Sequence, residues 1–133
     1  MPPQALIAMG HAASRRTVLV VEDEILIRMS TVAMLEDAGF DVRDAENSAE
    51  ALCMLARYDE INVLMTDVRM PGLMDGLALV AQVCITYPAI RSIVVSANGS
   101  AAQASNAGAF GFVAKPYTAS ALVRAVNDTG ERH

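Results

Sequence analysis

Short apolar runs alternate along the chain with longer amphipathic stretches, and the alternation recurs five times. The apolar runs are rich in β-branched residues and are bounded by glycine, proline or charged residues, which is typical of buried strands in a parallel sheet. They predict strands at residues 17–21, 40–43, 61–66, 90–96 and 111–114. The stretches between them predict helices at residues 24–38, 48–57, 75–86, 100–107 and 118–127.

This strand–helix alternation with short connections predicts an α/β domain with a doubly wound (βα)5 architecture. The flavodoxin-like strand order 2-1-3-4-5 is the expected arrangement of its five parallel strands. A chain of 133 residues is large enough for one such domain and its core. We expect the domain to span residues 16–128, between a flexible N-terminal tail at 1–15 and a C-terminal tail at 129–133.

Charge and hydropathy narrow the class of protein. A net charge of −5 and a pI of about 4.8 disfavour direct nucleic-acid binding, because phosphate contacts need clustered Lys and Arg. No stretch approaches the roughly 18 unbroken apolar residues of a membrane-spanning helix, and the start of the chain does not resemble a signal peptide. A cytoplasmic protein without membrane contact is therefore expected.

The few cysteines and histidines are not arranged for catalysis. Cys53 and Cys84 lie on separate predicted helices without metal-ligand spacing, so we expect free thiols that are buried or half-buried. His11 and His133 lie in the two predicted tails. A catalytic histidine is therefore not expected.

Carboxylates follow two strands that the predicted order makes neighbours. Glu22 and Asp23 follow the first strand, and Asp67 follows the apolar run of the third. Alone, Asp67 would be interpreted as a turn former or helix cap. The predicted order, however, brings all three carboxylates to the edge where open α/β sheets hold their reactive crevice. Their mutual repulsion is of the kind that Mg²⁺, a hard cation that prefers oxygen ligands, relieves.

The last two strands add a hydroxyl and a cation at the same edge. Ser96 ends the fourth strand, and Lys115 follows the fifth. A nucleophilic carboxylate, a metal cage, a hydroxyl and an ammonium group would together stabilise a phosphoryl group in transfer.

The same residues resemble the receiver domain of two-component response regulators. The resemblance covers roughly residues 16–128, and each motif is weak alone but the combination is specific. The motifs are Glu22-Asp23, Thr66-Asp67-Val68-Arg69-Met70-Pro71-Gly72, Asp75-Gly76, Ser96-Ala97, and Phe112 three positions before Lys115-Pro116.

The resemblance implies a signalling switch of a two-component system or phosphorelay. Asp67 would accept a phosphoryl group from a histidine kinase or histidine phosphotransferase, and the protein would catalyse only its own phosphorylation and dephosphorylation. The resemblance also implies a Mg²⁺ cofactor held by Asp23, Asp67 and the backbone carbonyl of Arg69, with Glu22 acting through water. The readout would be contact with an unknown downstream protein, by a monomer or weak dimer.

Three further residues receive roles from the resemblance. Lys115 would pair with the acceptor carboxylate or its phosphate, and its bond to Pro116 would be a cis peptide, which an X-Pro bond adopts at modest cost. Ser96 and Phe112 would be the hydroxyl and aromatic switch residues.

Four features depart from the family's usual pattern. Leu73 looks like an extra residue in the loop above the acceptor, so this loop is expected to be reshaped. Ser96 stands where Thr is commoner, and Phe112 lacks the hydroxyl of a Tyr. Ser96 and Lys115 are also separated by about one helical turn fewer than usual, which together with an alanine-rich composition predicts a short, weakly docked helix at 100–107.

Several alternatives remain open from the sequence. The chain ends soon after its last predicted helix, which favours a stand-alone receiver without an output domain over a receiver cut from a longer regulator. A Mg²⁺-dependent aspartyl-phosphate phosphatase would need an acid two positions after its nucleophile, where this chain has Arg69. A receiver-like module that is never phosphorylated is a further alternative. Ile25, Met29 and Val32 widen the apolar face of the first helix, either as core or as a surface that docks a partner.

Overall fold

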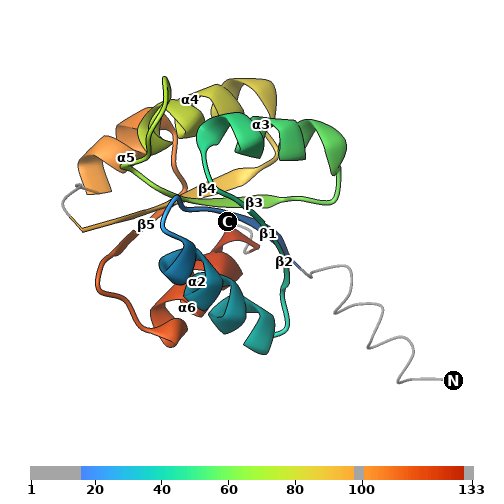
Figure 1. The fold of residues 1–133 in the computed structure, drawn as a ribbon, viewed down its shortest axis with the longest axis vertical. Coiled ribbons are helices and arrows are strands. Elements are labelled where there is room, and N and C mark those ends of the chain that lie inside the picture. Colours follow the sequence, from blue (N-terminus) through green and yellow to red (C-terminus); the bar gives the residue numbers. More distant parts are fainter. Residues whose placement is uncertain (1–15, 98–100, 131–133) are drawn as a thin grey trace, which may run out of the picture.

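A computed structural model describes residues 16–97 and 101–130 of the chain. The predicted N-terminal tail therefore lies outside the described residues. Strands and helices alternate through the described part (Figure 1), in the order β1 Thr17–Val21, α2 Ile25–Asp37, β2 Asp41–Ala45, α3 Ser48–Arg57, β3 Val63–Asp67, α4 Gly76–Thr86, β4 Arg91–Ser96, α5 Ala101–Ala107, β5 Gly111–Ala114 and α6 Ala119–Thr129.

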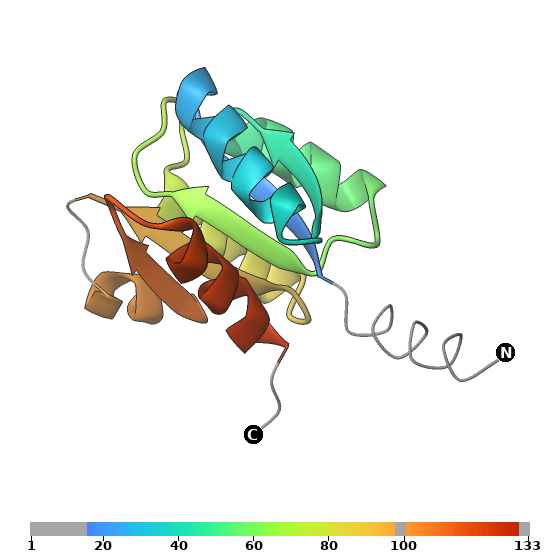
Figure 2. The same cartoon turned by 90° about the horizontal axis from the view of Figure 1, so that it is seen from below.

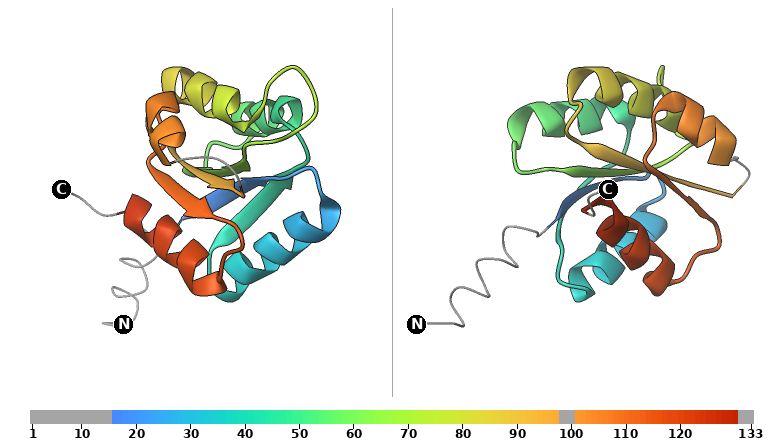
Figure 3. Two further views of the ribbon diagram at one scale, coloured as in Figure 1. Left: turned by 90° about the vertical axis from the view of Figure 1, so that its left-hand side faces the viewer. Right: turned by 180° about the vertical axis from the view of Figure 1, so that it is seen from behind.

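The five strands form one parallel sheet in the order β2-β1-β3-β4-β5, so the predicted fold class and strand order are confirmed. Helices cover both faces of the sheet. Helices α3, α4 and α5 lie on one face, and α2 and α6 lie side by side on the other (Figures 1 and 2). The two further views in Figure 3 show the same three layers from the side and from behind.

The central strands contribute to two separate cores because successive side chains point to opposite faces of the sheet. In β1, Leu19 and Val21 belong to the core beneath α3, α4 and α5. Val18 and Val20 belong to the core beneath α2 and α6. All four side chains are at most 2% exposed, which explains why the strand is an unbroken apolar run.

Most predicted bounds agree with the structure to within a few residues, and the differences have local causes. The second strand is Asp41–Ala45 rather than 40–43 because it pairs along its whole length with β1. Asn47, not Ser48, caps α3, since its side chain accepts a hydrogen bond from the backbone N–H of Glu50. The Ser48 hydroxyl is instead buried and donates to the backbone carbonyl of Met74, 2.9 Å away.

The apolar face of α2 only partly belongs to the core. Thr31 and Leu35 are buried, as predicted, but Ile25 and Met29 are each 59% exposed and Leu26 is 77% exposed. A broad core face is therefore the wrong interpretation of the first two turns of this helix.

The cysteines differ from the sequence-based expectation. The thiols of Cys53 and Cys84 are free, but both residues are exposed rather than buried or half-buried. Within residues 16–97 and 101–130, no helix has the length and apolar character needed to cross a membrane.

Candidate functional site

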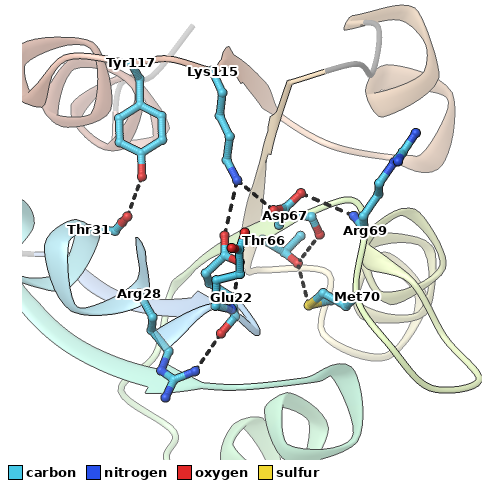
Figure 4. Close-up of polar contacts among 10 residues, drawn as sticks. Glu22, Arg28, Thr31, Thr66, Asp67, Arg69, Met70, Lys115 and Tyr117 are labelled. Carbon is cyan, nitrogen blue, oxygen red and sulfur yellow. Dashed lines mark hydrogen bonds and ion pairs between the residues drawn. The ribbon is translucent and has the colours of Figure 1, made fainter. Parts of the chain in front are cut away.

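Three charged side chains converge where β1, β3 and β5 end. Val21 and Thr66 are partners in the sheet, so the next residues along the two strands, Glu22 and Asp67, are neighbours. Lys115 follows β5 and extends over the edge of the sheet toward both carboxylates (Figure 4). The parallel sheet thus brings together residues that are up to 93 positions apart in the sequence.

The Lys115 ammonium bridges the two carboxylates. Its Nζ lies 2.7 Å from Oδ2 of Asp67 and 3.3 Å from Oε1 of Glu22. Burial of the ammonium opposes its charge, but the hydrogen bond and charge of Asp67, joined by those of Glu22, outweigh it and raise the pKa of Lys115. Lys115 therefore stays protonated beside the carboxylates, and it is the only lysine in the chain.

Glu22 is the buried member of the pair, with 4% of its surface exposed. Burial raises the pKa of Glu22 from 4.5 to about 7. The backbone N–H of Glu24, which donates to its Oε2 at 3.1 Å, and the charge of Lys115 oppose this shift, whereas the charge of Asp67 adds to it. Near neutral pH, the negative charge on Glu22 is therefore energetically unfavourable.

The backbone around Asp67 is tightly held. Its Oδ1 accepts a hydrogen bond from the backbone N–H of Arg69 at 3.2 Å, and its carbonyl accepts one from the Thr66 hydroxyl at 2.8 Å. Gly76 closes the loop from behind, with its N–H donating to the Val68 carbonyl at 2.8 Å. A Cβ at Gly76 would lie 1.8 Å from the Asp67 carbonyl oxygen, so only glycine fits at this position.

Asp23 and Arg69 lie on the solvent side of the acceptor. Both are exposed, and together with Asp75 they line an open hollow of about 390 Å³. Among the described residues, no three His, Cys, Asp or Glu side chains are grouped so that they could hold a metal ion. An ion at this edge would therefore take fewer carboxylates and complete its shell with a carbonyl and water, which suits Mg²⁺.

Ser96 and Phe112, the expected switch residues, lie on neighbouring strands. Ser96 is buried at the end of β4 and pairs in the sheet with Ala114 of β5. Its carbonyl accepts the backbone N–H of Lys115 at 3.0 Å. Phe112 is half-buried and packs against the core beneath α3, α4 and α5. The expected cis peptide between Lys115 and Pro116 is present.

Arg28 is a site residue that sequence reasoning missed. Its Nη1 donates to the backbone carbonyl of Glu22 at 2.8 Å, and its Nε pairs with Oδ2 of Asp44 at 3.0 Å (Figure 4). Arg28 thereby fastens α2 to the ends of β1 and β2. No pattern in the sequence distinguishes this arginine from a solvated one, because one partner is a backbone carbonyl six residues away and the other is a carboxylate on β2, 16 residues away.

An open apolar hollow of about 540 Å³ adjoins the site. It is formed where α2 meets the loop after β5, and its lining residues are Leu26, Ile27, Ser30, Ala97, Lys115, Pro116 and Tyr117. Leu26, which is 77% exposed on the first turn of α2, thus lies beside Lys115 in this hollow.

Comparison with protein-family models matches residues 18–127 to the response regulator receiver domain. The chain is 35% identical over 119 residues to the C4-dicarboxylate transport transcriptional regulatory protein DctD of Rhizobium meliloti (strain 1021), which covers 87% of this chain and 25% of that protein. It is 37% identical over 120 residues to the sensor kinase CckA of Brucella abortus (strain 2308), covering 87% and 13%. It is 39% identical over 106 residues to the DNA-binding transcriptional regulator NtrC of Escherichia coli (strain K12), covering 77% and 22%. The chain therefore spans a quarter or less of these relatives.

Solved structures give the same result. The receiver domain of NtrX from Brucella abortus has a TM-score of 0.80 and 28% identity, and covers 87% of this chain and 99% of that one. A response regulator receiver domain protein from Clostridium thermocellum has a TM-score of 0.80 and 30% identity, covering 86% and 93%.

Proposed function

The chain belongs to the response regulator receiver domain family, and on this basis we propose that it is a phosphorylation-dependent switch whose phosphoryl acceptor is Asp67. The observation that carries the proposal is the 2.7 Å contact between the Lys115 ammonium and the Asp67 carboxylate, at the edge where three strands end. Asp67 is a half-buried nucleophile with one oxygen held by a cation and the other by a backbone N–H. This arrangement suits a carboxylate that exchanges a phosphoryl group.

The proposed transfer needs few groups from the protein. An oxygen of Asp67 attacks the phosphorus of a phosphohistidine, a P–O bond forms, and the P–N bond breaks, with the imidazole keeping the electron pair and then gaining a proton. Lys115 balances the charge on the phosphoryl oxygens. Dephosphorylation is a separate step: water attacks the phosphorus and forms a new P–O bond, the P–O bond to Asp67 breaks with the carboxylate keeping the electron pair, and the protons of water leave with inorganic phosphate or to solvent.

A divalent cation is part of the proposal. Asp23, Asp67 and the backbone carbonyl of Arg69 would hold Mg²⁺, and Glu22 would contact it through water. When bound, the ion would neutralise charge on the phosphoryl oxygens. Asp23→Ala should therefore weaken Mg²⁺ binding, so that phosphorylation is slower and needs a higher Mg²⁺ concentration, without unfolding the protein, because the Asp23 side chain is exposed.

The phosphodonor is proposed to be a histidine kinase or histidine phosphotransferase. A protein donor must cover the acceptor edge, and the exposed residues Ile25, Leu26 and Met29 lie beside it on α2. Exposed apolar patches of this kind commonly mark protein contacts. Ser96 and Phe112 are proposed to report the phosphoryl group to a downstream protein.

Intact-mass measurement tests this function. Wild type incubated with Mg²⁺ and acetyl phosphate should gain the mass of one phosphoryl group, and Asp67→Asn should gain none. Asp59→Asn, which changes an exposed carboxylate in the loop before β3, is the matched control and should label like wild type. Stoichiometric labelling of Asp67→Asn would falsify the assignment. An unlabelled wild type would favour the inert module, and steady turnover of phosphomonoesters would favour the phosphatase.

A further inference from the structure

The loop that carries Lys115 is fastened to the fold at two points. Before the cis peptide, the backbone N–H of Lys115 donates to the carbonyl of Ser96 at 3.0 Å. After it, the Tyr117 hydroxyl is hydrogen bonded to the Thr31 hydroxyl at 2.5 Å, across 86 positions of sequence. Figure 4 shows Tyr117 directed at α2 while Lys115 is directed at the two carboxylates.

The Thr31–Tyr117 bond lies in a closely packed place. Thr31 is 4% exposed, and the Tyr117 ring packs against the core beneath α2 and α6. Both residues line a hollow of about 10 Å³ together with Glu22 and Asp67. A hollow of this size holds at most about one water molecule. If the Thr31 hydroxyl were removed, water could therefore hardly replace it as the hydrogen-bond partner of the Tyr117 hydroxyl.

Helix α2 therefore makes a hydrogen bond on each side of the site, one at the carboxylates and one at the lysine loop. Arg28 binds the carbonyl of Glu22, at the carboxylate side. Thr31, three residues later on the same helix, binds the loop at the lysine side. Only Pro116, whose φ angle is fixed, separates Lys115 from Tyr117, so a displacement of Tyr117 is transmitted to the lysine.

We propose that the Thr31–Tyr117 hydrogen bond is a tether that positions the Lys115 ammonium against Asp67 and thereby sets the rate of phosphoryl transfer. Thr31 and Tyr117 are positioning residues that act through Lys115 and do not touch the phosphoryl group. The effect on rate rests on the proposed function, whereas the position of the lysine does not.

Kinetics of phosphorylation by acetyl phosphate test the tether. Tyr117→Phe keeps the ring and Thr31→Val keeps the branched shape, so each removes one hydroxyl. Each should lower the rate constant about fivefold, the factor that one net hydrogen bond is worth. The double variant should be no slower than the slower single variant, because both changes remove the same bond.

Two comparisons separate positioning from a general loss of stability. Thr129→Val removes another buried threonine hydroxyl, one that donates to the carbonyl of Val126 at 2.6 Å in α6, and it should leave the rate unchanged. Tyr117→Phe in a Lys115→Ala background should have no further effect on the slower phosphorylation that remains. The same fivefold loss with and without Lys115 would show that the bond only stabilises the fold, and would overturn the proposal.

A second readout does not depend on phosphorylation. Because Lys115 is the only lysine, protein labelled with ¹³C at the lysine ε carbon gives one lysine signal in NMR spectra. Tyr117→Phe should shift this signal in the direction that Asp67→Asn shifts it, and Thr129→Val should not. If wild type takes up no phosphoryl group, the proposed function fails and this signal alone decides the tether. An unmoved lysine signal in both Tyr117→Phe and Thr31→Val contradicts it.

Discussion

At the scale of single residues, the site is governed by the unequal burial of two neighbouring carboxylates. Glu22 is buried and Asp67 is half-buried, yet both contact the same ammonium. Burial raises the pKa of Glu22 to about 7, so its charge is the costly one near neutral pH. The free energy of unfolding should therefore depend on pH through Glu22.

Glu22 should make the metal-free protein less stable as the pH rises. Its pKa is about 7 in the folded state and 4.5 in the unfolded state, so the folded protein binds more protons between these values. The free energy of unfolding therefore falls as the pH rises from 4.5 to 7, by at most about 3 kcal/mol at 1.36 kcal/mol per pH unit. Glu22→Gln should remove this contribution.

Urea denaturation in the presence of a chelator measures this effect as the difference between wild type and Glu22→Gln. Glu46→Gln, at an exposed carboxylate in the β2–α3 connection, is the matched control and should parallel wild type. A difference that does not change with pH contradicts the assignment.

The sequence predicted the residue contacts that follow from strand order alone. Asp67 and Lys115 both come directly at strand ends, so the order 2-1-3-4-5 was enough to expect them close together. The burial of Glu22 depends on which side chains pack over it, and the Thr31–Tyr117 bond depends on rotamers 86 positions apart. Neither leaves a local pattern.

At the scale of elements, the β3–α4 loop passes very close to the backbone of Asp67. Gly76 begins α4 under the cap of Asp75, and its α carbon faces the backbone of Asp67. The sequence signalled a turn and a helix start here, but not this close approach, because backbone crowding has no pattern of its own. The same limit applies to Ser48. A serine at a helix start suits capping, but here its hydroxyl binds Met74.

Gly76→Ala should be strongly destabilising. The new methyl group would meet backbone atoms of Asp67 and Val68, which can yield only by moving β3 or the loop. We expect a loss of about 3 kcal/mol or more in the free energy of unfolding, together with slower phosphorylation.

Thermal unfolding of Gly76→Ala and Gly111→Ala tests this constraint. At Gly111 a methyl group would make only an ordinary contact, 3.7 Å from the Ile93 side chain, so the second variant should lie within about 1 kcal/mol of wild type. Equal losses in both variants would mean that the approach to Asp67 carries no special cost.

Helix α5 is short, as predicted, and few of its side chains are buried against the rest of the fold. It has seven residues, of which only Ala104 is buried. A helix of this length is not stable without tertiary packing, so its amides should exchange with solvent faster than those of the thirteen-residue α2. Phosphorylation should slow this exchange if the segment becomes ordered in the switched state. Hydrogen exchange of amides 101–107 before and after phosphorylation measures both effects, and protection equal to that of α2 without phosphate contradicts the idea.

At the scale of the whole molecule, the exposed apolar face of α2 lies beside the site, where Leu26 lines the same hollow as Lys115, and this supports the proposed contact with a protein phosphodonor. Ile25 and Met29 fit the helical pattern of a core face, and only the packing of α2 against α6 shows that they lie outside it. Amphipathic periodicity indicates that a face is apolar, but does not indicate what covers it.

Met29→Glu should affect phosphorylation by a protein phosphodonor more than phosphorylation by a small-molecule phosphodonor. The change places a charge on the exposed apolar face of α2, so it should slow transfer from a phosphorylated histidine phosphotransferase by a larger factor than transfer from acetyl phosphate. The ratio of the two rate constants, relative to wild type, measures the contribution of this face. Cys53→Ser, on the opposite layer of helices, is the control and should leave the ratio unchanged. A ratio that Met29→Glu also leaves unchanged would place the protein contact elsewhere.

The parallel sheet also divides the connections of the molecule into two groups with different tolerance to change. Every connection that precedes a strand lies at the edge opposite Asp67, about 20 Å away along a six-residue strand such as β4. Pro88 and Ala89, in the turn before β4, are exposed at that far edge. A fluorescent reporter or a whole domain inserted between them would therefore lie far from Asp67 and Lys115 and should not disturb the site. For protein engineering, the fold thus offers an attachment point at one end of the sheet that leaves Asp67, the proposed phosphoryl acceptor, undisturbed at the other end.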